Sequence, residues 1–314
     1  MRSRRALVAQ GWSDRAIDGA ARSGRLRLVR RGWYLPGDEW RELWPEGRHL
    51  AHVLAVTRDA QGGAVVSHAS AAVLWGLPLY RWTVPRVHLT VASSPRTSSG
   101  RDVMRHVAPL DPVDVVVRHG IACTSLRRTV FDIARQATPE AAVACADAAE
   151  RMVTSRGREW DLDARDSWRR SLAELVDGAV GARGIRQARR VLSFADGRAQ
   201  LPGESVSRLQ LVRLGFATPD LQVPVPDPMG GCYYVDFALR DVRALGEFDG
   251  KAKYADEALR RGMPLDAVLL AEKQREDVIR GVTQWRLARW GDEHCATPAK
   301  LAARLAAFGI RPPR

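Results

Sequence analysis

Residues 232–249, with the sequence CYYVDFALRDVRALGEFD, decide the fold that we expect for the C-terminal part of the chain. Apolar residues alternate with polar ones in two runs, which predicts strands over residues 232–239 and 242–248. Arg240 and Asp241 separate the runs as a two-residue turn, so the strands are antiparallel neighbours. The stretch therefore predicts a β-hairpin at the centre of a sheet.

Three acidic residues fall on one face of this hairpin. A two-residue turn places Asp236 opposite Leu245, and alternation then puts Glu247 and Asp249 on the face of Asp236. Asp236 and Glu247 become diagonal neighbours, roughly 7–8 Å apart. Carboxylates this close repel each other unless a cation neutralises them, and oxygen ligands suit Mg²⁺ or Mn²⁺. The pattern predicts a divalent-metal site formed by Asp236, Glu247 and Asp249.

The segments around the hairpin complete an α/β domain, which we place at residues 201–296. The other predicted elements are a helix over 204–214, a strand over 222–225, a helix over about 266–280 and a strand over 285–290. Glu204 opens the first helix and is a candidate for the same site. Its alternative role is to cap that helix and to form an i,i+4 ion pair with Arg208.

Lysines are concentrated directly after the acidic hairpin. The chain has 45 arginines and only 4 lysines, of which Lys251, Lys253 and Lys273 lie between residues 251 and 273. Arginine supplies charge equally well, but lysine can shift its pKa and orient or activate a water molecule. The clustering indicates a catalytic lysine, with chance retention of lysine codons as the alternative.

The C-terminal segment resembles the Vsr-like PD-(D/E)XK nuclease domain found in actinobacterial AbiEi-like proteins. The resemblance is carried by "GES" at a helix start, then "YVDF", "GEFDGKAKY" and "AEKQRED". It implies that Asp236 binds metal, that Glu247 is the acid of the (D/E)-x-K element and that Glu204 is a helix-borne acid. Lys253 would take the place of a histidine often found there.

The sequence departs from that family at one important position. Asp249 stands where the motif has lysine, so the catalytic base would come from Lys251, Lys253 or Lys273. The implied reaction is metal-assisted phosphodiester hydrolysis, with Arg275 holding a flanking phosphate. A solvated, self-paired helix face is the alternative for Lys273 and Arg275, and a catalytically inactive domain is the alternative for the whole segment.

The N-terminal residues are strongly basic. Residues 1–33 contain nine arginines against two aspartates, whereas residues 200–296 have a net charge of −2. A short helix over 3–10, a helix over 15–23 capped by Ser13 and a hairpin over 25–35 give the order of a winged helix-turn-helix. This order predicts binding to duplex DNA, and a basic surface without a partner is the alternative.

The N-terminal segment also resembles AbiEi-family antitoxins. There a helical pair leads into an "RRGWY" wing, and the stretch "VVSHASAAVLWGLPL" resembles their continuation. Ser67, His68 and Ser70 suggest a Ser–His pair, but we favour a helix-capping serine and a histidine at a helix start. The candidate DNA-binding residues of the whole chain are Arg15, Arg22, Arg25, Arg27, Arg30, Arg31 and Arg275.

The complete prediction is an α+β multidomain protein. Its segments are a winged helix-turn-helix at 1–60, an α/β middle region at 61–138, a helical connector at 139–200, the nuclease-like domain at 201–296 and a basic tail at 297–314. Apolar runs are far shorter than the roughly 20 residues that a membrane span needs, so we expect a cytoplasmic protein. The four cysteines show neither disulfide nor zinc-ligand spacing.

Three functions remain open from the sequence. The first is a DNA-binding protein with an Mg²⁺-dependent endonuclease-like domain, in a defence or toxin–antitoxin context. The second is an antitoxin-like transcriptional regulator whose nuclease fold is inactive, with an operon-encoded protein as a possible partner. The third is a nuclease toxin or defence effector restrained by its own N-terminal half. ATP-binding, dinucleotide-binding and zinc-protease motifs are absent from the sequence.

Overall fold

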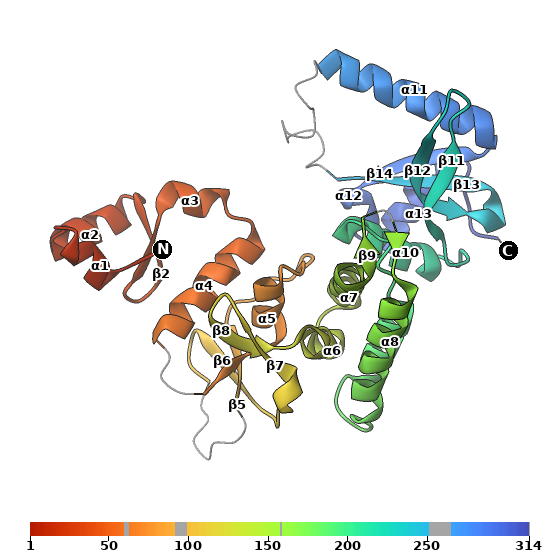
Figure 1. Ribbon diagram of the computed structural model, residues 1–314. Coiled ribbons are helices and arrows are strands. Elements are labelled where there is room, and N and C mark those ends of the chain that lie inside the picture. The colour runs from red at the N-terminus through yellow and green to blue at the C-terminus, as the bar shows by residue number, and fades with distance from the viewer. Residues whose placement is uncertain (60–62, 92–98, 158, 251–264, 314) are drawn as a thin grey trace. The chain divides into compact units, whose positions relative to one another are not determined.

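The structure is a computed structural model that describes residues 1–59, 63–91, 99–157, 159–250 and 265–313, with side chains from residue 270 in the last range. The chain forms two compact units (Figure 1). The N-terminal unit comprises residues 1–145 and 166–192, and the C-terminal unit comprises residues 146–165 and 193–314. Both units combine helices with sheets, which confirms a multidomain α+β protein. The units divide the predicted segment 139–200 between them.

The N-terminal unit begins with a helical pair and a hairpin, in the predicted order. The elements are β1 (Arg2–Ser3), α1 (Arg4–Ala9), α2 (Asp14–Arg22), β2 (Leu26–Arg30), β3 (Trp33–Pro36) and α3 (Gly37–Glu42). Ser13 caps α2 as predicted, because its hydroxyl accepts a hydrogen bond from the Ala16 N–H. Leu7, Ile17 and Tyr34 form the small core that joins helices and hairpin. β1 extends the hairpin to a sheet in the order β1-β3-β2.

A mixed sheet follows in the same unit. Its strands are β4 (Val65–Val66), β5 (Val87–Val91), β6 (Val103–Val107), β7 (Val115–Arg118) and β8 (Ile121–Thr124), in the spatial order β6-β5-β4-β8-β7. The helices around it are α4 (Pro45–Asp59), α5 (His68–Trp75) and α6 (Leu126–Gln136). α5 is apolar on all sides and nearly wholly buried, so it forms the interior of the unit.

The predicted helical connector contains helices that belong to both units. These are α7 (Pro139–Thr154), α8 (Leu162–Asp177) and α9 (Ile185–Phe194), with the short pair β9 (Ser155–Arg156) and β10 (Glu159–Trp160) between α7 and α8. The unit boundaries fall within all three helices. No helix in the described part of the chain has both the length and the apolar character needed to cross a bilayer.

The C-terminal unit is built on a sheet in the order β11-β12-β13-β14 (Figure 1). Its elements are α10 (Pro202–Arg213), β11 (Asp220–Pro226), β12 (Cys232–Leu239), β13 (Ala244–Asp249), α11 (Leu265–Thr283), β14 (Arg286–Gly291), α12 (Asp292–Cys295) and α13 (Pro298–Ala306). β11, β12 and β13 are antiparallel, and β14 is parallel to β13. The segment 297–314 belongs to this unit, since α13 buries Leu301 and Leu305.

The turn between β12 and β13 differs from the prediction. Residues Arg240–Val242 form a 3₁₀ turn, and Arg243 follows with φ of 50° in the left-handed region. The connection is thus four residues long instead of two, and Leu239 pairs with Ala244. The register shifts by two residues, so every side chain keeps its predicted face. The last residues paired in this register are Phe237 and Gly246. Continuing the register by one residue sets Asp236 opposite Glu247.

A buried ion pair joins the middle of α7 to α10. One terminal nitrogen of Arg208 lies 2.9 Å from each carboxylate oxygen of Asp147, and the two side chains are 2% and 1% exposed. Arg208 also donates to the Phe194 carbonyl and lies over the Phe194 ring, while Asp147 accepts from the Asp196 N–H. Arg208, the expected i,i+4 partner of Glu204, thus has Asp147 as a buried partner, while Glu204 accepts from the Gln200 N–H just before α10.

We predict that Asp147→Ala destabilises the C-terminal unit by about 3–5 kcal/mol, because it leaves a guanidinium buried without its counter-ion. Urea denaturation followed by circular dichroism measures the loss. The matched control is Arg240→Gln, which removes an exposed pair with Asp220 in the same unit and should cost at most about 1 kcal/mol. Equal losses for the two variants would contradict a structural role for the buried pair.

Candidate functional site

The acidic face of the C-terminal sheet lines a cavity of about 850 Å³. The predicted residues Asp236, Glu247, Asp249 and Arg275 all lie in its wall. Further charged and polar residues complete the lining: Arg151, Arg198, Gln200, Asp220, Gln222, Arg240, Glu272 and Arg289. The cavity is therefore mixed in charge, with arginines beside the carboxylates that the sequence predicted.

Glu247 is held by two arginines. Its Oε1 lies 2.5 Å from a terminal nitrogen of Arg275, and its Oε2 lies 2.9 Å from Nε of Arg289. Glu247 is 7% exposed, and Glu272 contacts both arginines. Burial lowers the pKa of Arg275 and Arg289, but the nearby glutamates outweigh it, so the pKa of both guanidinium groups rises. Both arginines therefore stay charged beside Glu247.

Gln222 connects two more of the predicted acids, Glu204 and Asp236. Its side-chain amide donates to Glu204 Oε2 and to Asp236 Oδ1, at 3.3 Å each. The second oxygen of Asp236 accepts from the Phe248 N–H at 2.8 Å, and Glu204 Oε2 also accepts from the Gln200 N–H. Gln222 has a left-handed φ of 51° within β11, which is uncommon for a residue with a side chain. Gln222, whose backbone is strained, thus makes the side-chain contacts that link α10 to β12.

The predicted lysines are not brought to the cavity in the described part of the chain. Lys273 is exposed on α11 and is not among the lining residues, whereas Arg275, two residues later, is. Lys251 and Lys253 lie outside the described residues. The cationic side chains that the structure does place in the wall are arginines. The self-paired helix face expected as an alternative is present in part, because Arg275 contacts Glu272 and Arg280 contacts Glu276.

The predicted DNA-binding arginines differ in their availability. Arg15, Arg22, Arg25, Arg27 and Arg31 are exposed around α2 and the hairpin. Arg30 instead pairs with Asp59 at 2.6 Å and with Asp102 at 2.5 Å, so its charge is neutralised within the N-terminal unit. This pairing makes Arg30 the least suitable of the set for contact with phosphate.

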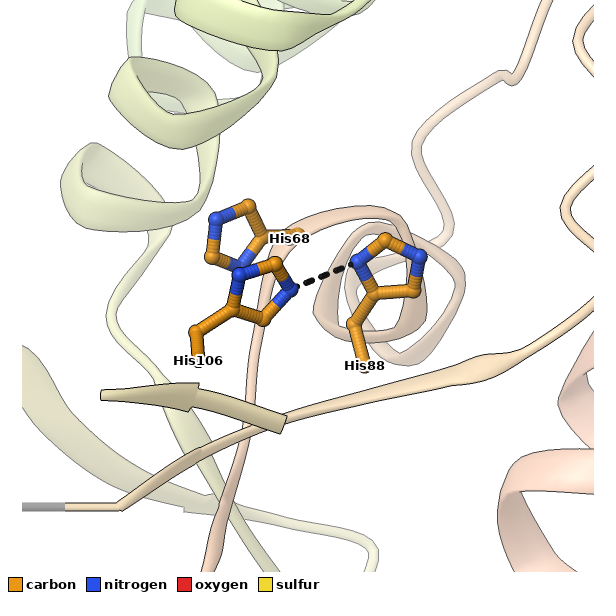
Figure 2. Close-up of side chains that lie close together, drawn as sticks. All are labelled: His68, His88 and His106. Atoms are coloured by element: carbon orange, nitrogen blue, oxygen red, sulfur yellow. Dashed lines mark hydrogen bonds between the residues drawn. The ribbon is translucent and has the colours of Figure 1, made fainter. Parts of the chain in front are cut away.

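A cluster of three histidines lies in the N-terminal unit (Figure 2). His68 begins α5, His88 lies on β5 and His106 lies on β6. One nitrogen from each ring lies within 4.8 Å of the others, a spacing at which the group could hold a metal ion. His106 Nε2 and His88 Nδ1 share a hydrogen bond of 3.0 Å, and the rings of His68 and His106 stack with centroids 3.8 Å apart.

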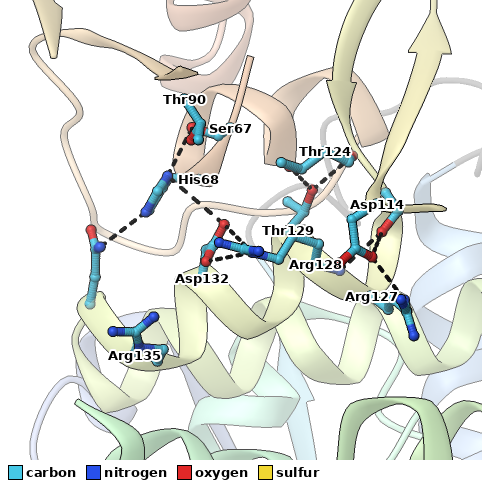
Figure 3. A network of polar contacts seen from close by, with 12 residues as sticks. Ser67, His68, Thr90, Asp114, Thr124, Arg127, Arg128, Thr129, Asp132 and Arg135 are labelled. Carbon is cyan, nitrogen blue, oxygen red and sulfur yellow. Dashed lines mark hydrogen bonds and ion pairs between the residues drawn. The ribbon is translucent and has the colours of Figure 1, made fainter. Parts of the chain in front are cut away.

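Polar contacts surround His68 (Figure 3). Its Nδ1 is 2.9 Å from the Ser67 hydroxyl and 4.0 Å from Asp132 Oδ2, and its Nε2 is 3.0 Å from the Gln136 amide nitrogen. Ser67 occupies the position before α5, but its side chain does not cap the helix and accepts from Thr90 instead. The predicted capping role of Ser67 is therefore wrong, since its hydroxyl contacts His68.

The residues that the sequence did not predict are Gln222, Arg289 and the histidine group. The histidines are separated by 20 and 18 positions, a spacing that matches no metal-binding motif. Only the pairing of β4, β5 and β6 brings them together, since His68 follows β4 and begins α5, as predicted. Gln222 and Arg289 lie on predicted strands next to the acidic hairpin, so the alternation of side chains was the one available signal.

We predict that the histidines make the N-terminal unit sensitive to acid. Burial, with smaller contributions from neighbouring histidines, lowers the pKa of His68 to about 2 and that of His88 to about 3. Both pKa values lie below the unfolded value of about 6.5, so stability falls as the pH drops below 6.5, by about 1.4 kcal/mol per pH unit for each histidine. His68→Gln and His88→Gln should flatten this slope in urea titrations, whereas His119→Asn, at an exposed turn, should leave it unchanged.

Comparison with known proteins gives relatives but no family. No family model matches the chain. The chain is similar to two uncharacterized proteins of Mycobacterium tuberculosis, one from strain CDC 1551 / Oshkosh and one from strain H37Rv, each 31% identical over 196 residues. The similarity covers 60% of this chain and 61% of each relative, so the chain spans less than two thirds of the length of the curated relatives it matches.

Proposed function

We propose that the C-terminal unit binds and hydrolyses phosphodiester bonds with the help of a divalent cation, and that the N-terminal residues bind duplex DNA. One observation carries the proposal: Asp236 and Glu247, on neighbouring strands, line one cavity, and Gln222 links Asp236 to Glu204 on α10. The resemblance of the motifs around these residues to the Vsr-like PD-(D/E)XK nucleases supports the same chemistry.

The residues fit a hard cation in the chemistry of their donors. Asp236 and Asp249 supply carboxylate oxygens beside Glu247, and carboxylates are the protein ligands that Mg²⁺ or Mn²⁺ prefers. Each oxygen of Asp236 accepts a hydrogen bond, but a carboxylate oxygen has a further lone pair to offer. When bound there, the cation would polarise the phosphodiester and stabilise negative charge in the transition state.

The chain's own residues would bind and orient the phosphate. Arg275 and Arg289 now pair with Glu247, and the guanidinium fork suits a phosphate as well as it suits a carboxylate. In the proposed complex these arginines exchange part of their contact with Glu247 for contact with phosphate oxygens. Gln222 keeps Glu204 and Asp236 in fixed orientations, which limits the reorganisation that binding requires.

The antitoxin-like regulator is the second candidate, and one observation favours it. Both oxygens of Glu247 are occupied by arginines, and the described part of the cavity wall contains no lysine. A charged guanidinium at each oxygen opposes the approach of a cation to Glu247. A domain of this kind would bind DNA without cutting it. The regulator would act together with an operon-encoded protein partner. If the domain is an active nuclease, the chain could instead be a toxin or defence effector restrained by its own N-terminal half.

We predict that the purified chain nicks supercoiled plasmid in the presence of Mg²⁺ or Mn²⁺ and that Asp236→Ala and Glu247→Ala each lower the rate at least about 100-fold. Gel analysis of the plasmid forms gives the rate. Asp277→Ala, at an exposed acid on α11, is the matched control and should cut normally. Equal rates in all variants would disprove the site. If the unmodified chain binds the DNA but does not cut it, the result favours the regulator.

We predict that the exposed arginines carry the DNA affinity. Arg27→Ala and Arg31→Ala should each weaken binding to a fluorescent duplex of mixed sequence and reduce the slope of log affinity against log salt by about 0.9, because each removes one phosphate contact. Fluorescence anisotropy at several salt concentrations measures both effects. Arg189→Ala removes an exposed arginine of α9 and should leave the slope unchanged. The same slope for all three variants would contradict binding by the hairpin.

A further inference from the structure

We propose that His68, His88 and His106 form a binding site for one divalent transition-metal ion of the zinc class, separate from the carboxylate cavity. The three rings contribute one nitrogen each, and these nitrogens lie within 4.8 Å of one another (Figure 2). Imidazole nitrogen suits Zn²⁺ and its neighbours in the transition series, whereas Mg²⁺ prefers oxygen. The donor type therefore selects a different ion from the one proposed for the C-terminal unit.

The protonation state of the cluster favours coordination. Metal ions bind neutral imidazole, and the buried setting of His68 and His88 disfavours the charged form of the ring. At neutral pH the hydrogen bond between His106 Nε2 and His88 Nδ1 joins two neutral rings. Binding would replace this bond and shift the proton of the donor ring to its other nitrogen, so no net release of protons is needed.

The environment of His68 resembles the support that metal-binding histidines need. Its Nδ1 lies 2.9 Å from the Ser67 hydroxyl and 4.0 Å from the Asp132 carboxylate, an arrangement that orients a ring and raises its basicity (Figure 3). His68 also has a left-handed φ of 52° at the start of α5. Such backbone strain is kept where surrounding contacts fix it, and it concentrates at binding sites.

One ring must turn when the ion binds. A metal lies in the plane of each imidazole that binds it, and the stacked rings of His68 and His106, inclined by 18°, cannot both point at one ion. His68 is 5% exposed and contacts Ser67 through Nδ1 and Gln136 through Nε2, so its ring is held. Coordination through Nε2 would replace the Gln136 contact and keep the Ser67 contact. His106 is only half-buried and lies on the edge strand β6. We therefore assign the movement to His106.

Nearby charges both oppose and assist the ion. Arg86 lowers the pKa of His88 and His106, which shows that its positive charge is felt at the site. Arg128 and Arg135 act on His68, but Arg128 is paired with Asp132 at 3.1 Å. Arg86 contacts the Met104 sulfur, a neutral group that does not offset its charge. Its removal should strengthen metal binding without altering a ligand.

The test uses the full chain, stripped with a chelator, in a Cys232→Ser background because Cys232 is an exposed thiol. Titration calorimetry with Zn²⁺ and the visible absorption of bound Co²⁺ report affinity, stoichiometry and geometry. We expect one ion per chain, a loss of affinity of at least about tenfold in His88→Gln and in His106→Ala, and a gain in Arg86→Gln. His119→Asn and Asp236→Ala should bind as the unmodified chain does.

Several results would overturn the proposal. These are a failure of the unmodified chain to bind Zn²⁺, equal affinity in His106→Ala and His119→Asn, or loss of Zn²⁺ binding in Asp236→Ala. Circular dichroism distinguishes the loss of a metal ligand from unfolding. His106 is half-buried whereas His68 and His88 are buried, so His106→Ala should disturb the fold least. A thousandfold excess of Mg²⁺ should not displace Zn²⁺, and displacement would assign the ion to oxygen ligands instead.

Discussion

The C-terminal unit depends on the ion pair between Arg208 and Asp147. Neither group can be buried alone, so the middle of α7 and the middle of α10 must meet with both nitrogen–oxygen contacts formed. Arg208 lies one turn after Glu204, and its bond to the Phe194 carbonyl fixes the chain that leads into α10. The pair thereby sets the position from which Glu204 reaches Gln222, and Gln222 in turn reaches Asp236.

A second constraint comes from the opposite face of the sheet. A side chain at Gly246 would collide with Trp290, and one at Gly203 would collide with the ring of Phe248, so both glycines are required for close packing. Trp290 stacks on Phe237 and donates to the Ser207 hydroxyl. Because side chains alternate along β13, this packing of Gly246 and Phe248 directs Glu247 to the other face. The position of the acid is thus a consequence of the core behind it.

Patterns of period two predicted the C-terminal sheet and the face shared by its acids, because alternation is a local property. The turn at residues 240–243 was not predictable, since its left-handed residue is Arg243 and not glycine. Arg289 and the histidine group were missed for another reason. Their contacts join separate elements, and only the pairing of β13 with β14 and of β5 with β6 determines which side chains meet.

The same long-range contacts change the meaning of the net charge of +13. A guanidinium that already pairs with a carboxylate releases few counter-ions when DNA approaches, so it adds little to affinity. Arg4, Arg30, Arg127, Arg208 and Arg289 are all engaged in this way. The exposed arginines of α2 and the following hairpin, among them Arg15, Arg22 and Arg27, keep their charge available to a polyanion. Basicity counted along a sequence indicates a polyanion partner only where the folded chain leaves its cations unpaired.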